Sequence, residues 1–339
     1  MKPSLLKRAL PRSGLGLTSL GFGSMAIGGQ YLGVTETEAV DTVTAALDAG
    51  VSFFDTAPQY GCGMAEERLG VALSARDAID AVVCTKVGKL IAPLGSGGQR
   101  QTNLHFPGGH DCELVFDYSY DATKRSIEAS LGRLGRATVE IALVHDVTRH
   151  FHGESGVHEA AERALGGALV ALRQLREEGV VKAIGTGLKD VDIAARFVEE
   201  ADIDVVLVPG RMTLLDQSAL TTGLLDLCEK HAVGVVAAAP FDSGILATGP
   251  IAGARYGYQA ASQEMIERTR AIAEVCNAHG VELASAALQF ALRHPAVVSV
   301  LAGMRDTREV AENVARMIAP VPPELWAELA KRCSVKLPG

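Results

Sequence analysis

Four ionisable residues lie where apolar runs of this chain end. Asp55 and Tyr60 stand five positions apart just after the run that contains Phe53, and Lys86 and His145 each close a later apolar run. The carboxyl ends of parallel strands meet at one edge, so we expect these four side chains to lie together. An acid, a phenol, an amine and an imidazole in one place can transfer a proton to or from an oxygen atom.

The phenol of Tyr60 is the predicted acid-base group. Free tyrosine titrates near roughly pH 10, so Tyr60 needs a cation beside it to favour the phenolate. We assign that role to Lys86, which Asp55 would hold charged and in place, while His145 would hydrogen-bond the reacting oxygen or share its proton. Singly, each residue is better explained as a strand-end cap, a packing residue, a solvent-facing amine or a core histidine. Together they favour catalysis.

Short runs rich in Val, Ile and Ala alternate with longer amphipathic segments, which is typical of parallel strands with crossover helices. The strand candidates are 19–23, 52–56, 82–86, 141–145, 182–186, 204–208, 234–239 and 298–302. The helix candidates are 36–49, 65–74, 121–134, 159–178, 190–200, 218–231, 263–279 with 282–293, and 307–317. Eight such units predict an α/β fold, a (β/α)8 TIM barrel.

Local signals refine this prediction. Thr35 and Glu38 form a capping-box pattern before the first helix, and Asp121 is the predicted cap of the helix that ends at Leu134. Pro323 begins a C-terminal extra helix through Arg332. The segments 87–118, 146–158 and 241–262 are longer than a barrel needs, and all follow strands, so we expect them at the substrate-binding face. The first is interpreted equally well as a lid or as a mobile insertion.

Composition excludes several protein classes. Of 339 residues 48% are apolar, yet no stretch approaches the roughly 18 apolar residues of a membrane helix, so we expect a soluble protein without a membrane partner. A net charge of -8 with scattered Lys and Arg argues against nucleic acid. No apolar segment follows the basic N-terminus, so we expect no signal peptide and a cytoplasmic location. Six widely spaced cysteines predict reduced thiols.

The ionisable set resembles the catalytic tetrad of the aldo-keto reductases. Residues 54–61 read Phe-Asp-Thr-Ala-Pro-Gln-Tyr-Gly, 85–86 read Thr-Lys and 144–146 read Val-His-Asp, in the order and spacing of that family. The resemblance runs from the strand at Gly21 to Asn313. It implies a single barrel domain over 1–339, an N-terminal hairpin at 5–18 that plugs the barrel floor, and a nicotinamide cofactor.

Two further segments resemble the cofactor-binding parts of the family. The loop after the seventh strand would fold over the pyrophosphate, and the stretch after the eighth would wrap the adenosine. The matching residues are Phe241, Ser243, Gly244, Leu246, Gly303, Arg305, Glu309 and Asn313. Gly187, Leu188, Lys189 and Pro209 stand where the family usually binds the carboxamide, and Ala238 replaces an aromatic ring that stacks on nicotinamide, a role Phe241 could take.

The adenosine stretch favours NAD, with NADP possible. Gly303 and Met304 bring neither charge nor hydroxyl, whereas the family typically uses cations and hydroxyls to hold the 2′-phosphate of NADP. Glu309 would repel that phosphate and accept a hydrogen bond from a free ribose hydroxyl. Arg305 acts in the opposite sense, and if Glu309 simply faced solvent, Arg305 would favour NADP.

Residues 86–90 (Lys-Val-Gly-Lys-Leu) and 116–121 (Phe-Asp-Tyr-Ser-Tyr-Asp) resemble one branch of the family. That branch contains D-threo-aldose (L-fucose) 1-dehydrogenases and a pyridoxal 4-dehydrogenase, which oxidise cyclic hemiacetals to lactones. The resemblance implies an NAD(P)-dependent dehydrogenase acting on an aldose or on pyridoxal, a small-molecule substrate in either case. The bond change is the same for both, so the sequence leaves the two substrates open, and the oligomeric state as well.

Three alternatives compete with this interpretation. His145, Asp146, His150, His152 and His158 could be a metal cluster, but four of the five lie in one segment, so we predict no metal site. A reductase of small aldehydes or ketones would use the same tetrad. A non-catalytic nucleotide-sensing regulatory subunit would share the fold, although an intact tetrad argues against it.

Overall fold

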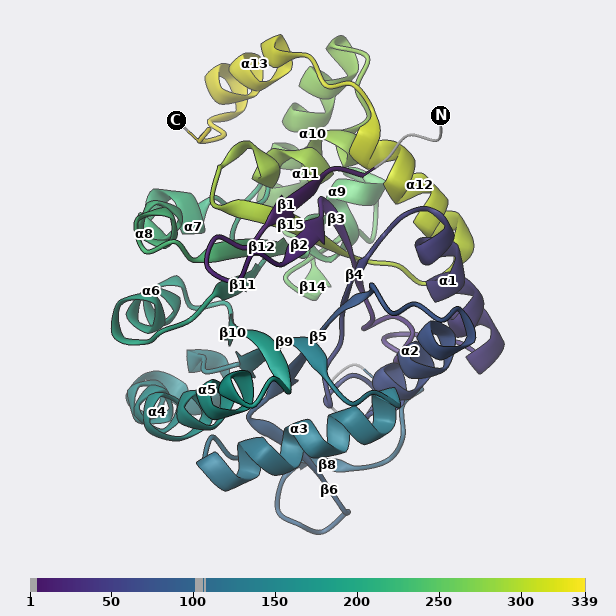
Figure 1. The fold of residues 1–339 in the computed structure, drawn as a ribbon. Helices are drawn as coiled ribbons and strands as arrows, with labels where there is room; N and C mark the ends of the chain where they lie inside the picture. Colours follow the sequence, from purple (N-terminus) through teal and green to yellow (C-terminus); the bar gives the residue numbers. More distant parts are fainter. Residues whose placement is uncertain (1–4, 101–105, 107, 339) are drawn as a thin grey trace.

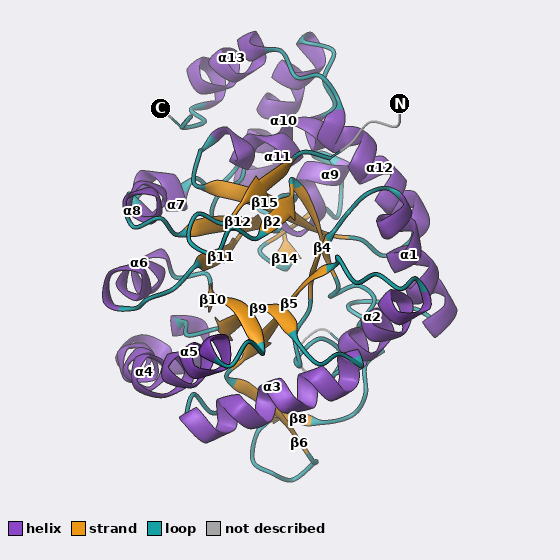
Figure 2. Ribbon diagram, viewed as in Figure 1, coloured by secondary structure: helices purple, strands orange, loops and turns teal. Residues whose placement is uncertain are grey.

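A closed barrel of eight parallel strands forms the centre of the molecule, in the order β10-β11-β12-β15-β3-β4-β5-β9 (Figures 1 and 2). It is seen in a computed structural model that describes residues 5–100, 106 and 108–338. The strands are β3 (Leu20–Gly23), β4 (Phe53–Asp55), β5 (Val82–Val87), β9 (Val139–His145), β10 (Val181–Gly187), β11 (Val205–Pro209), β12 (Gly234–Ala238) and β15 (Val297–Gly303). Each lies within two residues of its expected range, and the predicted (β/α)8 fold is confirmed.

Helices surround the barrel on its outside (Figure 2). The helices are α1 (Glu36–Asp48), α2 (Met64–Ala75), α3 (Tyr120–Leu134), α4 (Arg149–Arg163), α5 (Leu169–Glu177), α6 (Val191–Glu200), α7 (Ser218–Thr221), α8 (Leu224–Lys230), α9 (Ile245–Thr248), α10 (Gln263–Ala278), α11 (Leu283–Phe290), α12 (Thr307–Ile318) and α13 (Pro323–Cys333). Short π- and 3₁₀-helical turns, η2 (Ala164–Ala168), η3 (Asp242–Gly244) and η4 (Ala291–Arg293), adjoin α5, α9 and α11.

The caps show how the sequence starts these helices. The capping box of α1 is confirmed, since Thr35 Oγ1 accepts from Glu38 N–H at 3.3 Å and Glu38 Oε2 accepts from Thr35 N–H at 2.9 Å. The predicted Asp121 cap is wrong. Helix α3 begins earlier, because Ser119 in an extended conformation accepts from Ala122 N–H, which leaves Asp121 within the first turn.

Strand alternation decides which side chains enter the barrel. Successive residues of a strand point to opposite faces, so Phe53 belongs to the inner apolar cluster and Phe54 to the outer cluster beneath the helices. Leu143 points inward in the same way. This alternation therefore places the side chains two positions later, among them Asp55 and His145, at the inner rim of the barrel.

The N-terminal hairpin closes the end of the barrel where the strands begin. Strands β1 (Lys7–Ala9) and β2 (Gly16–Thr18) pair antiparallel. Leu10 and Leu17 are fully buried in the inner cluster, and Leu10 lies against the start of β12 at Gly234. The predicted hairpin plug is present.

The three long segments after strands are more ordered than simple loops. Segment 87–118 contains a three-stranded antiparallel sheet of β6 (Lys89–Ala92), β8 (Glu113–Phe116) and β7 (Gln99–Arg100). Segment 241–262 contains η3, α9 and a small hairpin of β13 (Arg255–Tyr256) and β14 (Gln259–Ala260). The prediction of a loop over 146–158 is wrong for the residues from Arg149 on, which are helical. Helix α4 begins there and is kinked at Gly153, and Phe151 packs on Phe116 of the inserted sheet.

The prediction that the cysteines are reduced is wrong for one pair. Cys62 and Cys112 form a disulfide with a Cα–Cα distance of 6.2 Å, although 50 residues separate them. The inserted sheet folds back over the loop after β4, where His110 N–H donates to Gly61 O at 3.0 Å, and this brings the thiols together. Among the described residues, no helix is long and apolar enough to cross a membrane.

Candidate active site

Lys86 is the centre of a buried cluster at the carboxyl ends of β4 and β5. Its Nζ donates to both carboxylate oxygens of Asp55 at 2.7 Å and to Thr56 O at 2.8 Å. An ammonium group has three hydrogens, so these three bonds use all of them. Lys86 also lowers the pKa of the neighbouring Tyr60, chiefly through its charge.

Burial and charge have opposite effects on Lys86. Burial alone would lower the pKa of Lys86, but the carboxylate of Asp55 outweighs it and raises that pKa. The ammonium is therefore charged near pH 7. Asp55 thus holds Lys86 in place, as the sequence suggested.

Tyr60 lies beside this ion pair. Gly61 follows it in a left-handed conformation (φ 65°), where a Cβ would run into the carbonyl of Gly28, so the turn after Tyr60 requires glycine. The ring stacks on Phe106 with centroids 6.0 Å apart, and Lys86 Nζ lies 4.8 Å from its centroid. Burial raises the pKa of Tyr60 by more than Lys86 lowers it. The phenol therefore holds its proton in this structure, and the expected effect of Lys86 is only a partial offset.

His145 faces Tyr60 at a nearly perpendicular angle, with ring centroids 6.3 Å apart. Burial lowers the pKa of His145 to about 3, with Lys89 and Lys86 acting in the same direction. The imidazole is therefore neutral near pH 7 and able to donate or accept a hydrogen bond. The structure brings all four predicted residues to one end of the barrel.

A second buried lysine, which the sequence analysis did not single out, lies next to this cluster. Lys89 donates to Gln59 Oε1 at 2.6 Å and forms an ion pair with Asp146. Its Nζ lies 4.0 Å from the ring centroid of Phe151. The sequence signal that could have identified Lys89 is the pattern Lys-Val-Gly-Lys at the end of β5, in which Lys89 follows Lys86 by three positions.

Residues 187–189, which stand where the resemblance places the carboxamide contacts, lie at the end of β10 and just after it. Gly187 pairs with His145 in register, and Lys189 follows the end of β10 with its ammonium 4.5 Å from the ring centroid of Tyr258. Burial lowers the pKa of Lys189. Ala238 points into the barrel interior and brings no ring.

The segment after β12 makes a tight turn at the mouth of the barrel. Ser243 and Gly244 both have positive φ, and Ser243 Oγ accepts from Tyr258 N–H at 2.9 Å. Leu246 is buried in the outer core, and its N–H donates to Phe241 O. Among the residues of this segment that the sequence analysis expected to bind the cofactor, Phe241, Ser243 and Gly244 are partly exposed. Leu246 is buried, and its backbone N–H is already bonded.

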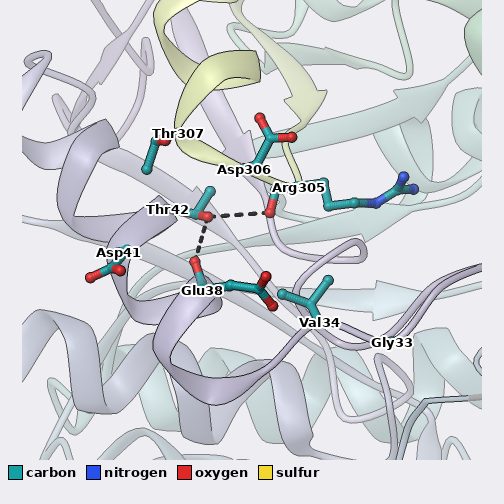
Figure 3. Close-up of a pocket in the computed structure, with 8 residues that line it drawn as sticks. All are labelled: Gly33, Val34, Glu38, Asp41, Thr42, Arg305, Asp306 and Thr307. Atoms are coloured by element: carbon teal, nitrogen blue, oxygen red, sulfur yellow. Dashed lines mark hydrogen bonds between the residues drawn. The ribbon is translucent and has the colours of Figure 1, made fainter.

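The segment after β15 borders a cavity of 260 Å³ between the start of α1 and the start of α12 (Figure 3). Its lining residues are Gly33, Val34, Glu38, Asp41, Thr42, Arg305, Asp306 and Thr307. Thr42 Oγ1 donates to Glu38 O and to Arg305 O. The lining therefore includes three acidic residues and one arginine, whose guanidinium extends away from the other lining side chains (Figure 3).

Glu309 does not simply face solvent. Its Oε2 accepts from Arg305 N–H at 2.8 Å, so the carboxylate fixes the turn that precedes α12. Gly303 is exposed at the end of β15. Asn313 is buried, and its Oδ1 accepts from Arg316 at 3.4 Å.

Several buried polar groups near the mouth of the barrel have no hydrogen-bond partner among the described residues. These groups are the hydroxyls of Ser24, Thr56, Thr148 and Thr186 and the Nε of Arg305. All five lie at or just after the carboxyl ends of barrel strands. Buried polar groups are normally paired. Thr186 shares the outward register of Ile184, so it does not line the mouth. Arg305 Nε, beside the cavity after β15, fits a ligand rich in oxygen atoms, as a nicotinamide dinucleotide is.

The histidines after β9 do not converge. His150 and His158 are exposed, and His152 Nε2 lies 3.0 Å from the hydroxyl of Tyr118. Within the described part of the chain, no group of three or more His, Cys, Asp or Glu side chains could hold a metal ion.

Comparisons with known proteins agree with this geometry. The model of the Aldo/keto reductase family matches residues 19–332. The chain is similar to D-threo-aldose 1-dehydrogenase of a Pseudomonas species (36% identity, covering 97% of this chain and 98% of the relative). It is also similar to pyridoxal 4-dehydrogenase of Microbacterium luteolum (37% identity, 95% and 96% covered). An aldo-keto reductase from Bacillus halodurans in its holo form shares the fold with a TM-score of 0.73 at 24% identity, covering 98% and 97% of the two chains.

Proposed function

Because this chain belongs to the aldo/keto reductase family, and is thus a nicotinamide-dependent oxidoreductase, we propose that it oxidises a small cyclic hemiacetal to a lactone. The observation that carries this proposal is the buried cluster of Asp55, Tyr60, Lys86 and His145 at one end of the barrel. Lys86 is held by two 2.7 Å bonds to Asp55 and lies 4.8 Å from the Tyr60 ring.

In this proposal each member of the cluster has one task. Tyr60, once its own proton has been lost to solvent, takes the proton of the hemiacetal hydroxyl as the carbon–oxygen double bond forms. A bound oxidised nicotinamide would supply the acceptor for the hydride of the same carbon. Lys86 stabilises the phenolate of Tyr60 by its charge, and neutral His145 donates a hydrogen bond to the reacting oxygen.

Two substrate classes fit this reaction. One is an aldose such as L-fucose, which would give an aldonolactone, and the other is pyridoxal, which would give 4-pyridoxolactone. The similar relatives, at 36% and 37% identity, are named for these two classes.

We also propose that the cofactor is NAD. The segment after β15 and the segment after β12 would hold it through Gly303, Arg305, Glu309, Asn313, Phe241, Ser243 and Gly244. Leu246 is buried with its N–H bonded to Phe241 O, so it would support this turn by packing. Next to Arg305, the side chains of Glu38, Asp41 and Asp306 line the same cavity (Figure 3). Three carboxylates there disfavour an added phosphate group, and this supports a cofactor whose ribose is not phosphorylated.

One assay tests the proposal. Purified protein is incubated with NAD⁺ or NADP⁺ and a panel of aldoses, pyridoxal and simple alcohols, with and without a chelator, and formation of reduced cofactor is followed by absorbance. We expect turnover of at least one hemiacetal, unaffected by the chelator, with the lactone identified by mass spectrometry. Turnover of none of them would refute the proposed function, and turnover restricted to simple alcohols would refute the hemiacetal.

A further inference from the structure

The ion pair of Lys89 and Asp146 adjoins the catalytic cluster, but the proposed chemistry does not use it. Asp146 Oδ2 lies 3.6 Å from His145 Nε2, the atom that would face the reacting oxygen. The same carboxylate oxygen binds Lys89 Nζ. An acceptor and a buried cation therefore lie next to the position where the bond change takes place.

The two members of this pair differ in exposure. The side chain of Lys89 is 2% exposed and that of Asp146 is 19% exposed. Lys89 is enclosed by Gln59 Oε1 and the ring of Phe151. The carboxylate of Asp146 is therefore the more accessible member of the pair.

The backbone at Asp146 makes a tight turn at the end of β9. Asp146 has a φ of 54°, a left-handed conformation that Asp adopts more readily than most non-glycine residues. Its N–H donates to Gly187 O at 3.0 Å, which fixes the turn directly after His145. The carboxylate is charged, since His145 and Lys89 outweigh burial and lower the pKa of Asp146 to about 2.

A substrate held by His145 through its reacting oxygen would place the oxygen of the next carbon within reach of Asp146. In a vicinal pair of hydroxyls the two oxygens are about one hydrogen-bond length apart, a spacing that matches neighbouring donor and acceptor groups on the protein. A carboxylate in that position accepts a hydrogen bond from a hydroxyl and gains nothing from a C–H group.

We infer that Asp146 is a specificity-determining residue that accepts a hydrogen bond from the hydroxyl on the carbon adjacent to the oxidised carbon. The preferred substrate is therefore an aldose with a free 2-hydroxyl rather than pyridoxal. This inference rests on the proposed hemiacetal oxidation and specifies its substrate. Lys89 serves as a positioning residue that holds the carboxylate.

The test compares an aldose that the wild type oxidises with the same sugar lacking its 2-hydroxyl, in the wild type and in Asp146→Asn. We expect the wild type to prefer the 2-hydroxy sugar in kcat/KM by about 10- to 100-fold, the range for a hydrogen bond to a charged group. Asp146→Asn should lose most of that preference, with a large drop on the parent sugar and less than about a threefold drop on the deoxy sugar.

Glu154→Gln is the matched control, because it removes one carboxylate charge from an exposed position of α4. It should leave the preference for the 2-hydroxyl unchanged. Equal losses on both sugars in Asp146→Asn would show that Asp146 only supports His145, and would overturn the inference while leaving the proposed function intact. If the variant does not fold, equal kcat/KM of the wild type for the two sugars, or a higher value for pyridoxal than for every aldose, overturns it. Failure of the wild type to oxidise any hemiacetal refutes the proposed function itself.

Discussion

The two ends of the barrel mouth are organised differently. Near β4, β5 and β9, where the proposed catalytic side chains lie, Lys86 is bound to Asp55 and to Thr56 O. Near β15, the backbone of Arg305 is held by Glu309, but its Nε is buried and has no partner in the part of the chain that the structure describes. Three acidic residues are among those that line the adjacent cavity. Both ends contain buried polar groups without a partner among the described residues, Thr56 and Thr148 at the proposed catalytic end and Arg305 Nε at the proposed adenosine end. The proposed catalytic end differs in having a buried ion pair that fixes it before a ligand binds.

This difference has a physical origin. Proton transfer requires groups fixed within a few tenths of an ångström, so their positions are determined by buried internal bonds. Recognition of a nucleotide uses polar groups that exchange water for ligand, and these groups need no buried ion pair to fix them. Changes at the catalytic end should therefore affect rate and stability strongly, and changes at the adenosine end should mainly affect cofactor choice.

The largest effect is expected for Tyr60→Phe. Removing the phenolic oxygen removes the proposed proton acceptor, so turnover should fall by on the order of 10²–10⁴. Cofactor affinity, measured by fluorescence titration, should stay within about twofold of the wild type because the adenosine end is untouched. Full activity in this variant would remove Tyr60 from the mechanism.

Lys86→Met tests whether the buried ion pair holds the catalytic end together. Asp55 would be left buried without its partner, so the free energy of unfolding should fall by about 3–5 kcal/mol, measured by urea denaturation. Any residual oxidation should begin at a higher pH, since the pKa of Tyr60 rises further without the cation. The control is Lys182→Met, whose side chain is largely exposed. A pH profile identical to that of the wild type would show that Lys86 is only structural.

The disulfide of Cys62 and Cys112 fastens the inserted sheet to the loop that carries Tyr60. Replacing both cysteines by serine should lower the free energy of unfolding by roughly 2–4 kcal/mol, as expected for a cross-link that closes a long loop. Cys333→Ser, which removes a free thiol, is the control and should change stability by less than about 0.5 kcal/mol. An unchanged stability in the double variant would mean that the cross-link does not form in solution.

The sequence predicted the barrel and the candidate catalytic end better than the surrounding segments. Short apolar runs that alternate with amphipathic segments, and one polar residue at the end of several runs, are local signals. They were sufficient to place Asp55, Lys86 and His145 at the same end of the barrel. The disulfide could not be predicted, because it depends on how a 50-residue segment folds back. Lys89 was missed because its partner Asp146 is distant in sequence and was considered only as a metal ligand.

The adenosine end gives the smallest and most specific prediction, the change of cofactor preference in Glu309→Gln. The amide oxygen of glutamine still accepts the hydrogen bond from Arg305 N–H, so the turn before α12 is preserved and only one negative charge is lost. The variant should therefore gain roughly two- to fivefold in kcat/KM with NADP⁺, the size of one partly exposed charge interaction, and change little with NAD⁺.

Salt provides an independent check on Glu309→Gln, since the gain with NADP⁺ should shrink at high ionic strength if it arises from charge. Glu324→Gln at the exposed start of α13 removes the same charge far from the site and should leave the cofactor ratio unchanged. A wild type that is already faster with NADP⁺ would contradict the assignment of NAD. Arg305 would then dominate over the carboxylates that line its cavity.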